Sequence, residues 1–100
     1  MKKNDIIKDI TNHVNNNWPK GAVRKSFYIG IAADARDRLF NDHQVNEKSD
    51  IWIWRPADSD QIARDVEKHF LDLGLDGGPG GGDENTKQVY CFFQNEHTRR

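Results

Sequence analysis

Residues 26–43, SFYIGIAADARDRLFNDH, contain two side chains whose types and spacing suggest chemistry, Tyr28 and Arg38. Large apolar residues recur at every second position around Tyr28, which predicts a strand. Asp34 then follows two alanines and can cap a helix that carries Arg38. A strand–turn–helix unit can bring the phenol and the guanidinium into one cleft, where the two groups would suit a phosphate.

A carboxylate that could bind a metal lies in a later helix, predicted over residues 58–74. Apolar residues at helical spacing form a stripe along this helix, and Glu67 falls at the edge of the stripe. Its carboxylate can reach into a cleft and hold a hard cation such as Mg²⁺. The alternative is a solvated glutamate paired with Arg64 or Lys68.

These features resemble the signature of the GIY-YIG nucleases. Members of that family carry Tyr-Ile-Gly on a strand and an arginine ten residues after the tyrosine on the next helix, and residues 28–30 with Arg38 match both. A later helix in the family contains Ala-x-x-x-Glu, whose glutamate binds the metal ion, and Ala63 and Glu67 have this spacing. The resemblance covers about residues 26–74.

The resemblance implies a phosphodiesterase that acts on DNA or RNA and depends on Mg²⁺ or Mn²⁺. Glu67 would hold the metal, and Arg38 would stabilise the charge that develops on the phosphoryl group. Tyr28 would orient or deprotonate the attacking water. His43 is an alternative base, one residue beyond the position where many family members have a histidine or tyrosine.

The first half of the family signature is absent from its usual place. A Gly-Ile-Tyr strand should precede Tyr-Ile-Gly by about ten residues, but that region reads GAVRKSF. A strand of similar character, QVYCFFQ, occurs instead at residues 88–94. We predict that it pairs antiparallel with the strand of Tyr28, so that Tyr90 takes the place of the missing tyrosine, as in a circular permutation.

The elements around these residues predict an α+β fold in the order α-β-α-β-α-β, with helices flanking a small, mainly antiparallel sheet of three to four strands. The helix over residues 4–16 should be capped by Asn4 or Asp5. The strand IWIW, residues 51–54, should be central and covered on both faces, because both of its faces are large and apolar. Asp58, with Gln61 three residues later, resembles a capping box, and Gly74 supplies a C-cap.

The predicted organisation is a single domain over residues 1–100. It comprises an N-terminal helical extension (1–20), the GIY-YIG-like core (26–74), a glycine-rich loop (75–87) and the last strand (88–94). The loop is no Walker A motif, because Gly-Lys-Ser/Thr does not follow. Its amides could contact phosphate; the alternative is a flexible turn.

Composition narrows the class of protein. One hundred residues suit one domain, and no apolar run approaches the roughly 20 residues of a membrane span. We find no secretory signal and one cysteine, so we expect a cytoplasmic protein without a disulfide framework. The net charge of −1 and the pI of about 6.4 give no general attraction for nucleic acid. Oligomeric state stays open.

Two other functions fit the sequence. One is a catalytically inactive module that keeps the fold and binds protein or nucleic acid. The absent Gly-Ile-Tyr strand, the shifted histidine and the neutral charge favour it. The other is a small-molecule phosphate binder that uses Arg38 and the glycine-rich loop.

Overall fold

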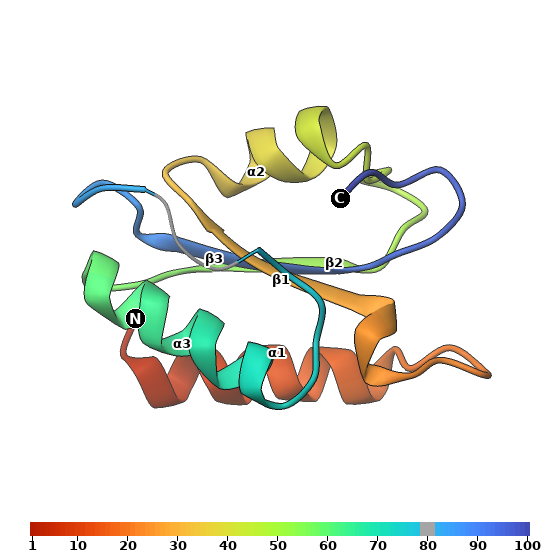
Figure 1. Cartoon of the computed structure of the whole chain (residues 1–100), viewed down its shortest axis with the longest axis horizontal. Helices are drawn as coiled ribbons and strands as arrows, with labels where there is room; N and C mark the ends of the chain where they lie inside the picture. Colours follow the sequence, from red (N-terminus) through yellow and green to blue (C-terminus); the bar gives the residue numbers. More distant parts are fainter. Residues whose placement is uncertain (79–81) are drawn as a thin grey trace.

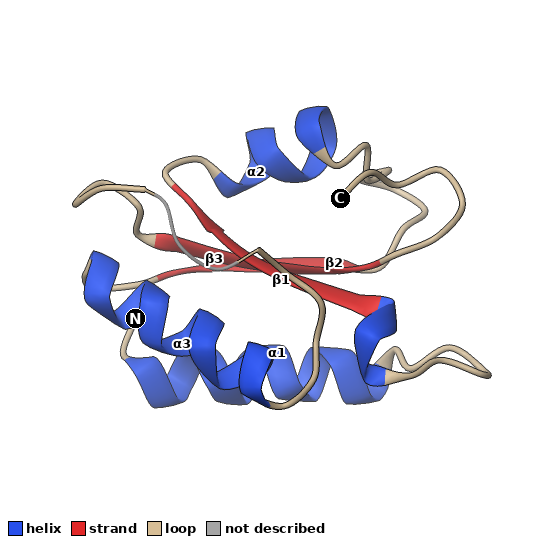
Figure 2. Cartoon of the chain, viewed as in Figure 1, coloured by secondary structure: helices blue, strands red, loops and turns tan. Residues whose placement is uncertain are grey.

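The computed structural model describes residues 1–78 and 82–100. Within these ranges, three antiparallel strands form one sheet with helices on both faces, which confirms the predicted small α+β fold (Figures 1 and 2). Figure 2 shows α1 and α3 on one face and α2 on the other. The elements in chain order are α1 (Lys3–Asn16), the 3₁₀ turn η1 (Arg24–Ser26), β1 (Phe27–Ala32), α2 (Ala35–Asp37), the π-helical turn η2 (Arg38–Asp42), β2 (Trp52–Pro56), α3 (Asp60–Asp72) and β3 (Gln88–Phe93).

The strand order β1-β3-β2 confirms the predicted antiparallel pairing of the last strand with the strand of Tyr28. In this register Gly30 lies opposite Tyr90 and Tyr28 opposite Phe92. The prediction that residues 51–54 form the central strand is wrong, because β3 is central and β2 is an edge strand. The helical layers cover both faces of the sheet, so an edge strand here can also be apolar on both sides.

The other edge of the sheet, along β1, is covered by the chain that follows α3. The Asp76 amide donates to the Phe27 carbonyl at 2.9 Å, and the Ile29 amide donates to the Asp76 carbonyl at 2.8 Å. Gly77 permits this approach, because a Cβ there would lie 2.6 Å from the Ile29 carbonyl oxygen. The start of the predicted glycine-rich loop therefore protects an edge strand. Residues 79–81 of that loop lie outside the described residues.

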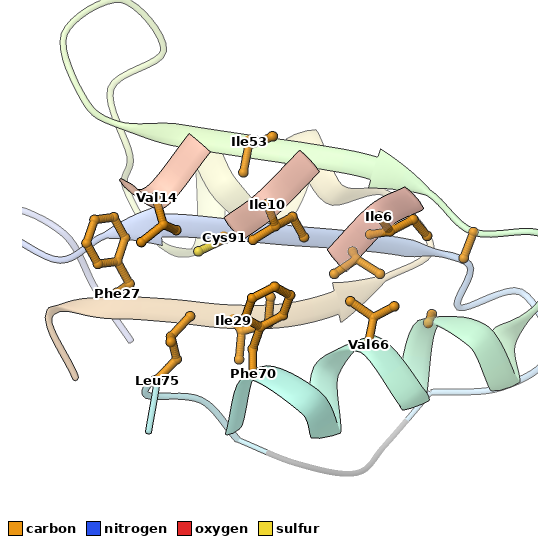
Figure 3. Close-up of a cluster of buried hydrophobic side chains, with 13 residues drawn as sticks. Ile6, Ile10, Val14, Phe27, Ile29, Ile53, Val66, Phe70, Leu75 and Cys91 are labelled. Atoms are coloured by element: carbon orange, nitrogen blue, oxygen red, sulfur yellow. The ribbon is translucent and has the colours of Figure 1, made fainter. Parts of the chain in front are cut away.

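The alternation of side chains along the strands builds two cores on opposite faces of the sheet. Figure 3 shows the core beneath α1 and α3, where Ile29 and Cys91 from the strands meet residues of both helices. The buried residues labelled in this core are Ile6, Ile10, Val14, Phe27, Ile29, Ile53, Val66, Phe70, Leu75 and Cys91. The second core, beneath α2 and η2, contains Leu39, Val45, Tyr90 and Phe92.

The starts of two helices differ from the sequence prediction. α3 begins at Asp60 and is capped by Ser59, whose Oγ accepts from the Ile62 amide at 3.1 Å. The predicted cap, Asp58, instead binds the amino group of Met1 at 2.7 Å. The N-cap of α1 is Lys2, without a side-chain hydrogen bond, so neither Asn4 nor Asp5 caps that helix. Beyond α3, Gly74 has φ +106°, a conformation typical of the glycine that follows a helix.

The two possible caps of α3 can be separated by substitution. Ser59→Ala should lower the free energy of unfolding by about 1 kcal/mol, because the Ile62 amide loses its acceptor. Asp58→Ala removes an exposed ion pair and should change the free energy of unfolding by less than about 0.5 kcal/mol. Urea denaturation of both variants measures the difference. A larger loss for Asp58→Ala would contradict the assignment of the cap.

In the described part of the chain, no helix is long and apolar enough to cross a membrane.

Candidate functional site

Four of the predicted site residues, Tyr28, Arg38, His43 and Tyr90, meet on the α2 face of the sheet. Tyr28 on β1 and Tyr90 on β3 are stacked, with ring centres 6.4 Å apart. The His43 ring centre lies 4.8 Å from that of Tyr28 and 5.4 Å from that of Tyr90. Arg38 completes the group through a side-chain hydrogen bond with Tyr90. We call these four residues the tyrosine–arginine–histidine cluster.

The helix after β1 positions Arg38 and His43. Asp34 caps α2 as predicted, since its Oδ1 accepts from the Asp37 amide at 3.1 Å. The chain then widens into the π-helical turn η2, in which the His43 amide donates to the Arg38 carbonyl at 2.8 Å. A π turn holds one residue more than an α turn. It therefore returns His43, five residues after Arg38, to the site.

Gly30 gives Tyr90 its place in the cluster. The Tyr90 ring crosses β1 directly over Gly30, and a Cβ added at this glycine would overlap the ring carbons and the hydroxyl. Tyr90 is only 1% exposed. Its hydroxyl lies 2.8 Å from His43 Nε2 and also accepts a hydrogen bond from Arg38. The glycine of Tyr-Ile-Gly thus makes room for a tyrosine supplied by the end of the chain.

The hydrogen bonds around His43 determine where its proton lies. Nδ1 is 2.6 Å from the main-chain carbonyl oxygen of Arg99, which can only accept, so Nδ1 carries the proton. In the neutral ring Nε2 is then an acceptor, and the Tyr90 hydroxyl donates to it. The result is a continuous path from the Arg38 guanidinium through the Tyr90 oxygen and the His43 ring to Arg99.

Tyr90 and His43 are both neutral at pH 7, and burial favours the neutral form of each. Burial raises the pKa of Tyr90 to about 12, although the hydrogen bond from Arg38 opposes this effect. Burial also lowers the pKa of His43, with the positive charge of Arg38 acting in the same direction and the Arg99 carbonyl opposing them. The net charge along this path is therefore that of the Arg38 guanidinium, which is half-exposed.

Tyr28 lies between the other three residues of the cluster and the glycine-rich segment. It is half-buried, and its ring stacks on Phe92 with ring centres 5.2 Å apart. A Cβ added at Gly78 would lie 3.8 Å from the Tyr28 hydroxyl oxygen, so the exposed start of that segment adjoins the phenol. Tyr28 is thus the more accessible of the two tyrosines.

Glu67 belongs to α3, on the opposite face of the sheet from η2. Ala63, one turn earlier and fully buried, lets the helix approach the sheet, and Glu67 itself is only 5% exposed. The alternative of a solvated Glu67 is therefore wrong. Burial raises the pKa of the Glu67 carboxyl, and the charge of Arg64 only partly opposes this. The negative charge of Glu67 in turn raises the pKa of Tyr90, so the two groups are electrostatically coupled.

A cavity of about 490 Å³ opens beside Arg38. The end of β1 and the start of α2 form one side of it, and Gly82 and Thr86 form the other. Its lining residues are Ile31, Ala32, Ala33, Asp34, Asp37, Arg38, Gly82 and Thr86. The half-exposed guanidinium of Arg38 is thus accessible to a ligand.

Comparison with known proteins leaves the family of this chain open. No protein-family model, no curated protein and no solved structure matches it. The resemblance to the GIY-YIG nucleases stays a prediction from the sequence.

Proposed function

We propose that this domain is a GIY-YIG-like, metal-dependent phosphodiesterase that acts on nucleic acid. One observation carries the proposal. Tyr90, from the last strand, packs over the glycine of Tyr-Ile-Gly and bonds both Arg38 and His43. The tyrosine missing from the front of the family signature is thereby replaced from the back of the chain.

Arg38 is the residue suited to bind the scissile phosphate. Its guanidinium is held on one side by Tyr90 and on the other by Asp42, whose Oδ2 is 3.5 Å from Nε. About half of the side chain remains exposed beside the cavity. A planar guanidinium donates to two phosphoryl oxygens at once and stabilises the charge that develops on them.

Tyr90 and His43 together can accept the proton of the attacking water. Alone, a phenol with a pKa of about 12 is seldom ionised at pH 7. Beside an unprotonated Nε2, however, it can pass its own proton to His43 while its oxygen takes one from water. The water oxygen bonds to phosphorus as the bond to the leaving oxygen breaks, and the imidazolium is stabilised by the Arg99 carbonyl. Tyr28, nearer the surface, would orient the water.

Glu67 fits a hard divalent cation such as Mg²⁺ or Mn²⁺. A buried carboxylate with a raised pKa is destabilised in its charged form, and a cation would relieve that cost. Among the described residues no group of three or more His, Cys, Asp or Glu could hold a metal. The resemblance assigns Glu67 as the protein ligand, and water and phosphate oxygens would complete the coordination, as is usual for Mg²⁺. A bound ion would supply charge neutralisation at the phosphate, which requires the substrate to reach from Arg38 on the α2 face of the sheet to Glu67 on the α3 face (Figure 2).

The alternative function is a catalytically inactive module that binds protein or nucleic acid. The specific observation in its favour is the burial of Tyr90, which is 1% exposed and whose hydroxyl already has two partners. If water cannot reach this oxygen, the cluster would only stabilise the fold.

Cleavage of mixed single-stranded, duplex and branched DNA and RNA with Mg²⁺ or Mn²⁺ tests the proposal. The parent protein should cleave, and Arg38→Ala should reduce the rate by about 100-fold or more, because it removes the group that stabilises the phosphoryl charge. Arg36→Ala is the matched control. Arg36 lies two residues away, has the same charge, and pairs with Glu47 instead of the cluster. It should leave the rate close to that of the parent, because its guanidinium is not part of the cluster.

Two outcomes would count against the proposal. If the folded parent cleaves none of these substrates, the binding module becomes the better explanation, and a salt-dependent affinity for DNA would indicate nucleic acid as its partner. If cleavage survives Arg38→Ala, the reaction takes place elsewhere.

A further inference from the structure

The chain beyond β3 folds back over the α2 face and ends beside the turn that follows α2 (Figure 1). We propose that Arg99 is a positioning residue of the site, acting through its main chain. Its carbonyl fixes the tautomer of His43 and thereby the direction of the Tyr90 O–H bond. The predicted effect on the cleavage rate rests on the proposed function, but the predicted tautomer of His43 does not.

Arg99 and His43 are joined at two points. The Arg99 amide donates to the His43 carbonyl at 2.7 Å, and the Arg99 carbonyl accepts from His43 Nδ1 at 2.6 Å. The pair of bonds fixes both the backbone and the ring of His43. His43 is 3% exposed, and the Arg99 carbonyl is the partner of its Nδ1.

Two carboxylates anchor the segment on either side of Arg99. Asp50, whose side chain is 7% exposed, accepts from Asn95 Nδ2 at 3.0 Å and lies 2.6 Å from His97 Nε2. Asp76, which covers the edge of β1, pairs with Arg100 at 2.5 Å. The carbonyl of Arg99 is thus held in place by contacts to two separate loops.

The tautomer matters because it sets the direction of the hydrogen bond to Tyr90. With the proton on Nδ1, Nε2 accepts from the Tyr90 hydroxyl and can receive its proton. With the proton on Nε2, the bond reverses, and Tyr90 loses the base that would take its proton. An imidazole held in the wrong tautomer loses most of its value as a base even when its position is unchanged.

Nitrogen NMR of ¹⁵N-histidine-labelled protein tests the inference, because the two tautomers give distinct Nδ1 and Nε2 shifts. The parent should show the proton on Nδ1 of His43. A variant lacking residues 97–100 should shift the ring toward the Nε2–H form and cleave about 100-fold more slowly, the scale of general-base catalysis. Arg99→Ala keeps the carbonyl and should keep the parent tautomer.

A second variant serves if the shortened chain fails to fold. Tyr90→Phe removes the hydroxyl but leaves the Arg99 carbonyl, so His43 should keep its proton on Nδ1. A parent with the proton on Nε2, or a shift to Nε2–H in Tyr90→Phe, would overturn the inference, as would an unchanged tautomer in the folded, shortened chain. These spectra need no cleavage activity, so the inference and the proposed nuclease function fail separately.

Discussion

Glu67→Gln should abolish metal-dependent cleavage and at the same time stabilise the domain at neutral pH. Glu67 is 5% exposed, and burial disfavours the charged form of its carboxyl group. Glutamine has nearly the same shape without the charge, so it removes that cost together with the proposed metal ligand. We expect the free energy of unfolding to rise by about 1 kcal/mol, as is common when a residue kept for function is replaced.

The gain in stability of Glu67→Gln should increase with pH. Because the pKa of Glu67 is raised in the folded state, its contribution to stability is complete below its ordinary pKa of 4.5 and is lost as the pH rises through the folded value. The Gln variant has no such titration. Its advantage over the parent should therefore be present at pH 7 and disappear below pH 4.5.

Urea denaturation at pH 4 and pH 7 and thermal denaturation with and without Mg²⁺ measure both effects. Mg²⁺ should raise the melting temperature of the parent but not of Glu67→Gln, because binding to the folded state stabilises it. Glu96→Gln, at an exposed position in the last loop, is the control and should behave as the parent. A Glu67→Gln variant that cleaves normally, or that is less stable than the parent at pH 7, would contradict the assignment.

Gly30→Ala should have the largest effect on stability, a loss of about 3 kcal/mol. Alanine is normally better than glycine in a strand by about 0.5–1 kcal/mol. Here its Cβ would overlap the ring and hydroxyl of Tyr90, which is enclosed by the second core and cannot move freely. Overpacking of this kind typically costs about 1–3 kcal/mol. The displaced Tyr90 hydroxyl should also lose its hydrogen bond to His43. The cleavage rate should therefore fall together with the stability.

A double-mutant cycle tests whether overlap with Tyr90 is the reason that Gly30→Ala destabilises the domain. In a Tyr90→Leu background, Gly30→Ala should cost less than about 1 kcal/mol, because the atoms that it overlaps are gone. Gly78→Ala is the control, since its Cβ would meet only the Tyr28 hydroxyl at 3.8 Å, an ordinary contact. If Gly30→Ala were equally costly with and without Tyr90, the glycine would have some other role.

Much of the fold could be predicted from the sequence because its signals are local. Alternating apolar residues mark β1, helical spacing marks α1 and α3, and Asp34 caps the helix after β1 as expected. Where two polar residues compete for one role, local reasoning fails. Asp58 and Ser59 are both good caps, and the choice of Ser59 leaves Asp58 to bind the Met1 amine, a partner distant in sequence.

The strand order depends on contacts between distant parts of the chain. Composition placed residues 51–54 at the centre of the sheet, yet β2 is an edge strand, because the helical layers cover apolar side chains on either side of any strand. The pairing of β3 with β1 could be predicted from a different argument. The family signature lacked a strand at the front, and the chain offered a suitable one at the back.

By itself, the sequence determined which side chains could serve the site, Tyr28, Arg38, His43, Tyr90 and Glu67, because residue type and spacing are written in it. Only the tertiary structure decided where they lie relative to one another. The π-helical turn returns His43 to Arg38, and Gly30 makes room for Tyr90. The Arg99 carbonyl sets the tautomer of His43, and such a group leaves no trace in a sequence, because every residue has a carbonyl and only the fold determines where it points.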